Sequence, residues 1–171
     1  MDFFEIVKAR HSFRGCYTDA QVPEEDLIKI VDAGLRAPSG GNKQTTDFVI
    51  VTNAELIAKL SKIVVCDSIR TAPAVIVGIT SLFTLDFGLS FEVEDYSAAV
   101  ENILLAATAL GYASCWFDGT TRLGGRDEVI AKLLNIPQNK QVRTLMPVGV
   151  PENPGKQAPR KPFDERVTWK R

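Results

Sequence analysis

Three polar side chains near the start of the chain alternate in a way that suits the binding of a phosphate group. Arg10, Ser12 and Arg14 occupy every second position of the segment Arg10-His11-Ser12-Phe13-Arg14. In an extended segment, side chains two residues apart point to the same face, so two guanidiniums would flank a hydroxyl. A guanidinium can give a phosphate two charge-assisted hydrogen bonds. The spacing therefore predicts a phosphate cradle, although such a motif taken alone is more often a solvated basic loop.

A second segment, Ala37-Pro38-Ser39-Gly40-Gly41-Asn42-Lys43-Gln44, is a helix exit followed by a loop of small and amide side chains. Its polar groups can bond to a ligand's hydroxyls or ring edges, and its glycines let the backbone approach closely. An ordinary helix-ending turn has a similar composition. Together with the cradle, the loop indicates that the amino-terminal part of the chain holds a phosphate-bearing organic cofactor.

Composition and charge exclude several kinds of site. His11 is the only histidine among 171 residues, so a serine or cysteine nucleophile with a histidine base could use only that residue. The three cysteines form no Cys-x-x-Cys pair, and we expect no metal site. A net charge of −1 favours neither nucleic acid nor an anionic membrane as a partner. If the chain is an enzyme, a bound cofactor should carry the chemistry.

The length predicts a single domain, residues 1–171, with a sizeable core. Met1-Asp2-Phe3-Phe4-Glu5 lacks the basic and apolar regions of a secretory signal, and the apolar stretches are too short or interrupted to span a bilayer. Three widely separated cysteines fit a reducing compartment. We therefore expect a cytoplasmic protein.

Helices and strands are expected to alternate along the chain. Hydrophobic periodicity predicts helices at 2–9, 23–35, 54–63, 96–110 and 127–134, and strands at 47–52, 74–79, 113–117 and 144–150. This order favours helices on both sides of a sheet. No glycine motif of a dinucleotide-binding Rossmann fold or of a P-loop is present. The helix at 96–110 is apolar nearly all round and should be buried on most sides, and the tail from Pro151 should run extended over a surface.

The order and spacing of these motifs resemble the nitroreductase family of FMN-dependent oxidoreductases over nearly the whole chain. The similar segments are residues 10–14, 22–27, 37–44, 95–111, 114–119 and 159–167. The resemblance implies an α+β fold, a three-layer α/β/α sandwich around a mixed, mainly antiparallel sheet.

The resemblance also implies which residues bind FMN. The phosphate and nearby polar edges of the flavin would be bound by Arg10, His11, Ser12 and Arg14, joined from the tail by Arg160 and Lys161. A loop from the other subunit of an obligate homodimer would line the flavin with Pro38, Ser39, Gly40, Asn42 and Gln44. The backbone of Asp118 and Gly119 would lie near flavin N5, and no catalytic side chain is required.

Three positions depart from the family pattern. Gln44 is followed by Thr45-Thr46 where the family usually has Pro-Trp, and Ala158 replaces a frequent lysine. Lys156 or Lys161 could compensate for that lysine. In the segment 64–72, where relatives often supply an amide or a lysine, only Arg70 is a candidate.

The implied activity is the transfer of reducing equivalents from NAD(P)H through flavin N5 to a nitroaromatic, quinone or similar small-molecule acceptor, by a ping-pong mechanism. The sequence shows no motif for binding the 2′-phosphate of NADPH, so it does not indicate whether NADH or NADPH is the reductant. Two other functions stay open. One is a different flavin chemistry on the same scaffold, such as reductive dehalogenation or oxygen-dependent flavin breakdown. The other is a flavin-binding or flavin-storage protein without turnover.

Overall fold

A four-stranded sheet lies at the centre of the computed structural model, which describes residues 1–86 and 88–171. The strand order is β1-β2-β4-β3, and every neighbouring pair is antiparallel. The strands are β1 (Thr46–Val51), β2 (Ala74–Ser81), β3 (Ala113–Ser114) and β4 (Lys140–Gly149). A parallel bridge between Ser12 and Ser114 adds the amino-terminal segment beside β3. The sheet is therefore mixed but mainly antiparallel, as predicted.

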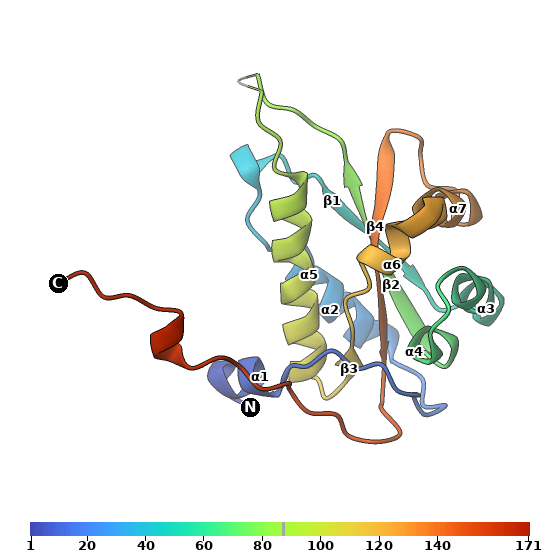
Figure 1. Ribbon diagram of the computed structural model, residues 1–171. Coiled ribbons are helices and arrows are strands. Elements are labelled where there is room, and N and C mark those ends of the chain that lie inside the picture. Colours follow the sequence, from blue (N-terminus) through green and yellow to red (C-terminus); the bar gives the residue numbers. More distant parts are fainter. Residues whose placement is uncertain (87) are drawn as a thin grey trace.

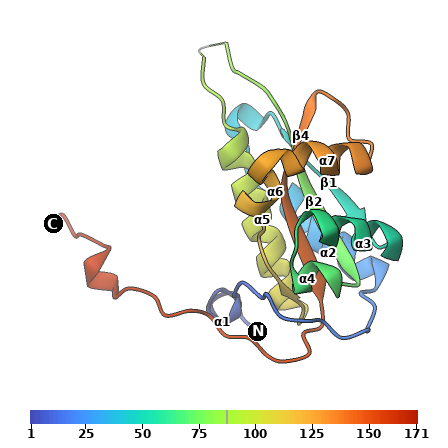
Figure 2. The same ribbon diagram turned by 45° about the vertical axis from the view of Figure 1, so that its right-hand side comes forward.

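Helices cover both faces of this sheet and make three layers (Figures 1 and 2). On one face lie α2 (Glu24–Leu35) and α5 (Glu92–Ala109), with α1 (Phe3–Ala9) packed against α5. On the other lie α3 (Ala54–Ile63), α4 (Asp67–Arg70) and α7 (Arg126–Leu133). The short helix α6 (Gly119–Arg122) follows β3, and single 3-10 turns lie at Gly40–Asn42, Leu123–Gly125 and Phe163–Glu165. The predicted α/β/α sandwich is confirmed.

Each face of the sheet carries its own hydrophobic cluster, because neighbouring residues of a strand point to opposite faces. Val75 and Val77 of β2 pack with residues of α3, α4 and α7. Ala74 and Ile76 pack with residues of α2 and α5. Each fully buried aliphatic side chain contributes about 1.5–3 kcal/mol to folding. The two clusters therefore hold the helices of both layers against the sheet.

Helices α2 and α5 approach closely at Gly34. A Cβ on this residue would lie 2.7 Å from Cγ1 of Ile103, so a larger side chain would push the helices apart. The Asn102 amide donates a hydrogen bond to the Ala33 carbonyl, 3.0 Å away, and adds a polar contact between them. Helix α5 stops just before Gly111, whose φ of +87° suits glycine at a helix end, as the sequence predicted.

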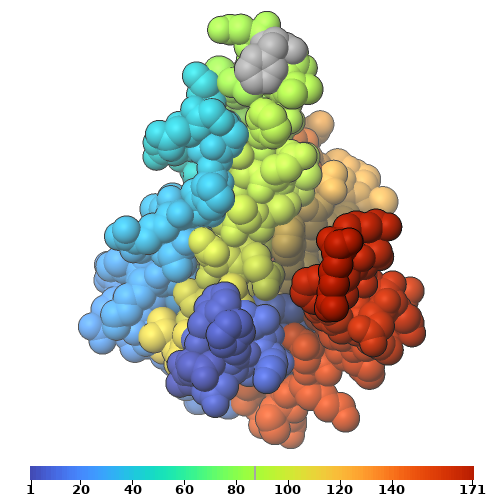
Figure 3. Space-filling model, turned by 90° about the vertical axis from the view of Figure 1, so that its left-hand side faces the viewer, coloured from blue at the N-terminus to red at the C-terminus, as the bar shows by residue number. Residues whose placement is uncertain are grey.

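The outer side of α5 lies at the surface of the chain. Figure 3 shows this helix running down the face that the viewer sees, between the segment around residues 36–45 and the carboxy-terminal tail. Val100 and Ile103 are fully buried against the sheet layer, whereas Ala98, Glu101 and Leu105 are only partly covered. The predicted burial on most sides therefore holds for the inward faces and not for the outer one.

Several boundaries differ from the prediction. Strand β3 has two residues, because only Ala113 and Ser114 pair with β4 before the chain turns away and rejoins it at a single Phe117–Leu145 bridge. Strand β4 begins at Lys140 and α5 begins at Glu92, each four residues earlier than expected. Beyond Gln157 every tail residue is exposed, and the tail extends away from the body past α1 rather than over its surface (Figures 1 and 2).

The part of the chain that the structure describes has no helix both long and apolar enough to cross a membrane. Within those same residues, no three or more histidine, cysteine or acidic side chains are grouped to hold a metal ion.

Candidate functional site

The segment that carries Arg10, Ser12 and Arg14 is extended and fixed to the edge of the sheet. The Phe13 N–H donates to the Ser114 carbonyl at 2.9 Å, beside the Ser12–Ser114 bridge. Phe13 is buried, with its ring centroid 5.0 Å from that of Tyr17, whereas Ser12 and Arg14 are exposed. The alternation of buried and exposed side chains is the pattern on which the predicted cradle depends.

Cys115 directly follows β3, beside the bridge that joins Ser12 to Ser114. Burial raises the pKa of its thiol, while the nearby side chains of Arg14, Ser12 and Arg10 act in the opposite direction. The extended segment thus carries Arg10, Ser12 and Arg14 at alternate positions along the edge of the sheet.

Arg10 is the least exposed of the three and is held on two sides. Its Nε lies 3.2 Å from a carboxylate oxygen of Glu101 on α5, and its side chain is 15% exposed. The amide of Gln157 donates to the Arg10 carbonyl at 2.8 Å and to the Val7 carbonyl at 3.2 Å. Neither Glu101 nor Gln157 was predicted to belong to the site.

His11, also predicted to bind the cofactor, turns toward the tail. Its Nδ1 lies 2.9 Å from the Ala9 carbonyl, and its Nε2 is buried without a partner in the part of the chain described. A Cβ on Gly155 would overlap the imidazole, so the tail crosses directly over the ring. The ring helps to line a separate hollow of about 410 Å³ beneath the tail, and the structure does not bring it together with the cradle side chains.

The loop 38–44 is anchored by one buried carboxylate that the sequence did not single out. Asp95, near the start of α5, is 4% exposed and accepts two hydrogen bonds. One comes from the Gly40 N–H at 2.7 Å and the other from the Thr45 hydroxyl at 2.8 Å. The Ser39 hydroxyl in turn accepts the Gln44 N–H at 2.9 Å. Both ends of the loop are therefore fixed to α5.

The backbone of the same loop has φ angles that residues other than glycine rarely adopt. Gly41, Asn42 and Gln44 all have positive φ, between 50° and 57°. At Gly40 a Cβ would lie 2.5 Å from the ring of Phe91, so only glycine lets the loop lie this close to the start of α5. Beside it is a hollow of about 220 Å³ whose lining includes Pro38, Ser39, Gln44 and Asp95. Asn42 is exposed.

Asp118 and Gly119 form a turn at the start of α6, and Asp118 is the centre of a polar network. Its carboxylate accepts the Tyr96 hydroxyl at 2.6 Å and Nε of Arg122 at 2.6 Å. The guanidinium of Arg143 donates to the Tyr96 hydroxyl at 3.3 Å and lies over its ring, 4.8 Å from the centroid. The exposed Gly119 follows directly. Tyr96 and Arg143 thus fix a turn whose environment the sequence did not predict.

Trp116 packs edge-on against Tyr96, with ring centroids 6.2 Å apart. Its indole Nε1 is buried and has no partner in the two described parts of the chain, and the same holds for the hydroxyl of Ser114. Buried polar atoms are normally paired, so these two groups, on either side of Cys115 in the sequence, are exceptions to that rule.

One chain holds the cradle and the loop at different places along α5. In Figures 1 and 2 the turn at residues 40–42 lies beside the upper end of this helix, whereas α1 and the cradle segment lie at its lower end. The contacts follow the same order, because the loop bonds to Asp95 in the first turn of α5 and Arg10 contacts Glu101 near its middle, about 9 Å further along the helix. The structure therefore does not bring the two predicted halves of the site together within one chain.

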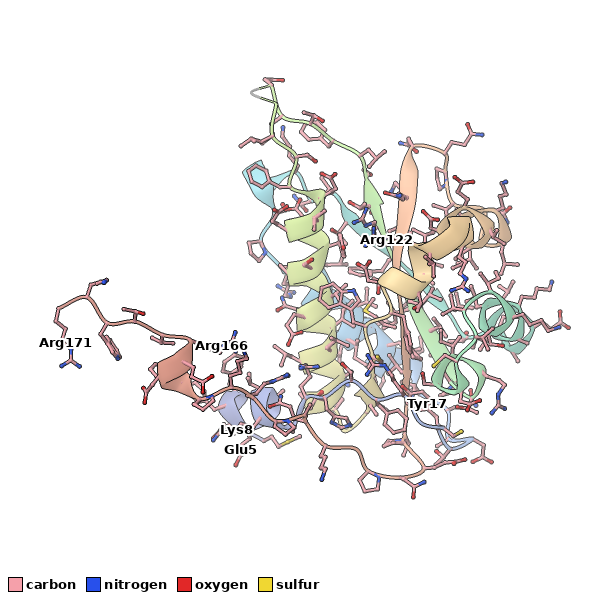
Figure 4. The ribbon with its side chains drawn as sticks, viewed as in Figure 1. Glu5, Lys8, Tyr17, Arg122, Arg166 and Arg171 are labelled. Atoms are coloured by element: carbon pink, nitrogen blue, oxygen red, sulfur yellow. The ribbon has the colours of Figure 1, made fainter. Side chains whose placement is uncertain are left out.

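The other basic residues considered for the site lie on the tail and on α4. Arg160 and Lys161 are exposed, and Figure 4 shows Arg166 and Arg171 further along the tail, away from the body, while Arg122 lies on α6 in the middle of the molecule. Arg70 lies on α4, where it pairs with Asp67 at 2.8 Å. Of the basic candidates, Arg10 and Arg14 share the extended segment at the edge of the sheet.

Comparison with known proteins identifies the family. The model of the nitroreductase family matches residues 7–74 and 65–150. A relative in Methanothermobacter thermautotrophicus, provisionally named NADH dehydrogenase/NAD(P)H nitroreductase, is 36% identical over 157 residues, which cover 91% of this chain and 81% of the relative. A protein of the same provisional name in Archaeoglobus fulgidus is 35% identical over 87% of this chain and 85% of its own.

A solved structure agrees with the sequence comparisons. An FMN-dependent nitroreductase from Clostridium difficile is 27% identical and superposes with a TM-score of 0.82. The match covers 98% of this chain and 99% of the other, so it extends over the sheet, both helical layers and the cradle segment. The chain therefore belongs to the nitroreductase family.

Proposed function

We propose that this chain is an FMN-dependent oxidoreductase that takes reducing equivalents from NAD(P)H and passes them to a small-molecule acceptor. The observation that carries the proposal is the extended segment at the edge of the sheet, which buries Phe13 and carries Arg10, Ser12 and Arg14 at the alternate positions. Two guanidiniums and a hydroxyl match the charge and the hydrogen-bonding needs of a phosphate. The FMN-dependent enzyme among the structural relatives supports FMN as the group that carries this phosphate.

When bound, FMN supplies the redox chemistry, which takes a hydride from NAD(P)H and delivers it to a nitroaromatic, quinone or similar acceptor in a ping-pong sequence. The residues of the chain bind and orient. Arg10 and Arg14 would neutralise the phosphate, and the Asp118–Gly119 turn would offer backbone N–H groups to the edge of the ring. Prearranged donors of this kind stabilise negative charge without having to reorganise.

The proposal includes an obligate homodimer. The loop at Pro38, Ser39, Gly40, Asn42 and Gln44 would line the flavin that the partner's cradle binds, and Arg160 and Lys161 would reach a phosphate from the tail. The separation of loop and cradle along α5 supports this arrangement, because a single chain presents two half-sites. We further propose that residues 1–171 form one domain and that the protein works in the cytoplasm.

Replacing Arg10 tests the cofactor site. We expect Arg10→Ala to remain folded and to lose FMN, because losing a buried guanidinium–phosphate pair costs about 2–5 kcal/mol of binding, or at least about 30-fold in affinity. The measurement is quenching of FMN fluorescence on titration with the apoprotein. Lys29→Ala is the control, since Lys29 pairs with Asp26 in the first half of α2, outside the proposed site. Full FMN affinity in Arg10→Ala would remove Arg10 from the phosphate site.

A second experiment separates an enzyme from a storage protein. The flavin absorbance of the loaded protein is followed after anaerobic mixing with NADH and, separately, with NADPH. Rapid bleaching by either supports the oxidoreductase. A flavin that stays oxidised with both would indicate storage instead, and flavin fragments formed in air would indicate oxygen-dependent breakdown.

A further inference from the structure

Arg10 has a neighbour that the proposed function does not require. Glu101 on α5 places its carboxylate 3.2 Å from Nε of Arg10, although a negative charge beside a phosphate site is unfavourable by itself. We propose that Glu101 is a positioning residue, which orients the Arg10 guanidinium for the phosphate. This inference rests on the proposed FMN site.

The backbone of Arg10 is already fixed before its side chain is considered. Its N–H donates to the Ile6 carbonyl at 2.9 Å and closes α1. Its carbonyl accepts the Gln157 amide at 2.8 Å. Three residues on, Phe13 bonds to the edge of the sheet. Because the backbone is held, only the direction of the long Arg10 side chain remains free. Restricting that side chain to one rotamer costs free energy.

Glu101 approaches the guanidinium from the side that a phosphate does not need. The nitrogen nearest to its carboxylate is Nε. None of the hydrogen bonds within residues 1–86 and 88–171 uses the two Nη groups of Arg10. A guanidinium has five N–H donors in a rigid fork, so a partner at Nε leaves the fork of the Nη groups available. The ion pair therefore orders Arg10 without using the atoms that we assign to the phosphate.

The arrangement also fits the exposures of the two residues. The Arg10 side chain is 15% exposed and the Glu101 side chain 47% exposed. Glu101 thus reaches its partner from the open side of α5, and its charge remains partly solvated. A half-exposed ion pair contributes little to folding, which makes orientation the more important effect.

Variants of Glu101 test this role through the affinity of the apoprotein for FMN and for riboflavin, which lacks the phosphate. We expect Glu101→Ala to weaken FMN binding about twofold to fivefold, the range of an exposed ion pair, and to leave riboflavin affinity unchanged. Glu101→Gln should bind FMN at least as well as the unmodified protein, because an amide oxygen of the same size still lies beside Nε while the repulsive charge is gone.

Two controls make the result specific. In a double-variant cycle, Glu101→Ala should have no further effect on FMN affinity once Arg10→Ala is present, since it acts through that side chain. Glu94→Ala removes a carboxylate two helical turns earlier on the same side of α5 and should change neither affinity. Thermal unfolding of each apoprotein shows that the variants are folded.

The outcomes separate the two hypotheses. If Glu101→Ala and Glu101→Gln both tighten FMN binding, Glu101 competes with the phosphate and the positioning role is overturned. Equal weakening for FMN and riboflavin, or an undiminished effect in the Arg10→Ala background, would also overturn it. If the unmodified protein binds FMN no better than riboflavin, it is the proposed phosphate site that fails.

Discussion

At the scale of single residues, the hydroxyl of the buried Tyr96 links the interior of the fold to the Asp118–Gly119 turn, which we place beside the flavin. The Tyr96 O–H donates to Asp118, and Arg143 donates to the same oxygen while covering the ring. Hydrogen bonds to charged groups contribute about 1.5–3 kcal/mol. Tyr96 therefore both stabilises the fold and holds the Asp118–Gly119 turn in one position.

We expect Tyr96→Phe to lower the free energy of unfolding by about 1.5–3 kcal/mol and to slow flavin reduction by NAD(P)H, while FMN affinity stays within about twofold. Urea unfolding, anaerobic stopped-flow absorbance and FMN titration measure the three effects. Tyr112→Phe is the matched control, because its hydroxyl also donates to a carboxylate, that of Asp26 at 2.8 Å, away from the turn. If both variants slow reduction equally, Tyr96 has no specific role at the turn.

At the scale of elements, Asp95 joins the loop 38–44 to helix α5. Its carboxylate accepts from Gly40 and from Thr45, so one buried side chain determines where both ends of the loop lie. Three positive φ values within the loop mean that it has few alternative conformations of similar free energy. The loop is thus held in advance of any ligand.

Asp95→Ala should release this loop, because it leaves the Gly40 N–H and the Thr45 hydroxyl without their acceptor. We expect faster hydrogen exchange of the backbone amides at residues 40–45 and weaker FMN binding in the dimer. Thr45→Val removes one of the two bonds and should give an intermediate result in both measurements. Unchanged exchange in Asp95→Ala would show that the loop is held by its own backbone.

At the scale of the whole molecule, apolar surface is left uncovered in several places. Phe3 and Phe4 on α1 are 62% and 71% exposed, and Phe163 and Trp169 on the tail are 60% and 67% exposed. Leu105, on the outer side of α5, is only partly covered. Apolar area of this extent on a protein surface usually marks an interface.

We therefore expect a dimer that stays associated at micromolar concentration, with an interface of more than about 2,000 Å². Leu105→Glu should dissociate it and lose FMN at the same time, because each flavin would need the partner's loop. Sedimentation velocity and bound-flavin absorbance give the two readouts. Val129→Glu, on the opposite layer at α7, is the control and should keep both. A monomer carrying one full equivalent of flavin would contradict both the interface and the shared site.

The sequence by itself determined the layers and the alternation of side chains on which the proposed cradle depends. The alternation of residue types from Arg10 to Arg14 shows which side chains share a face, because the direction of side chains on an extended backbone repeats every two residues. Periodicity located α2, α3, α7 and the buried strand β2, and Gly111 marked the end of α5 because glycine readily adopts positive φ. These features follow from local geometry and from the burial of apolar faces.

Only the tertiary structure decided how the polar groups pair. Glu101, Asp95 and Tyr96 all lie on α5, yet their partners Arg10, Gly40 and Asp118 come from three other segments of the chain. No local pattern encodes such pairs, since each depends on how helix and sheet pack. The sequence did not predict the short β3 or the outward course of the tail, for the same reason. Contacts with distant parts of the chain, and not the local propensity of the residues, determine where a strand ends or a tail lies.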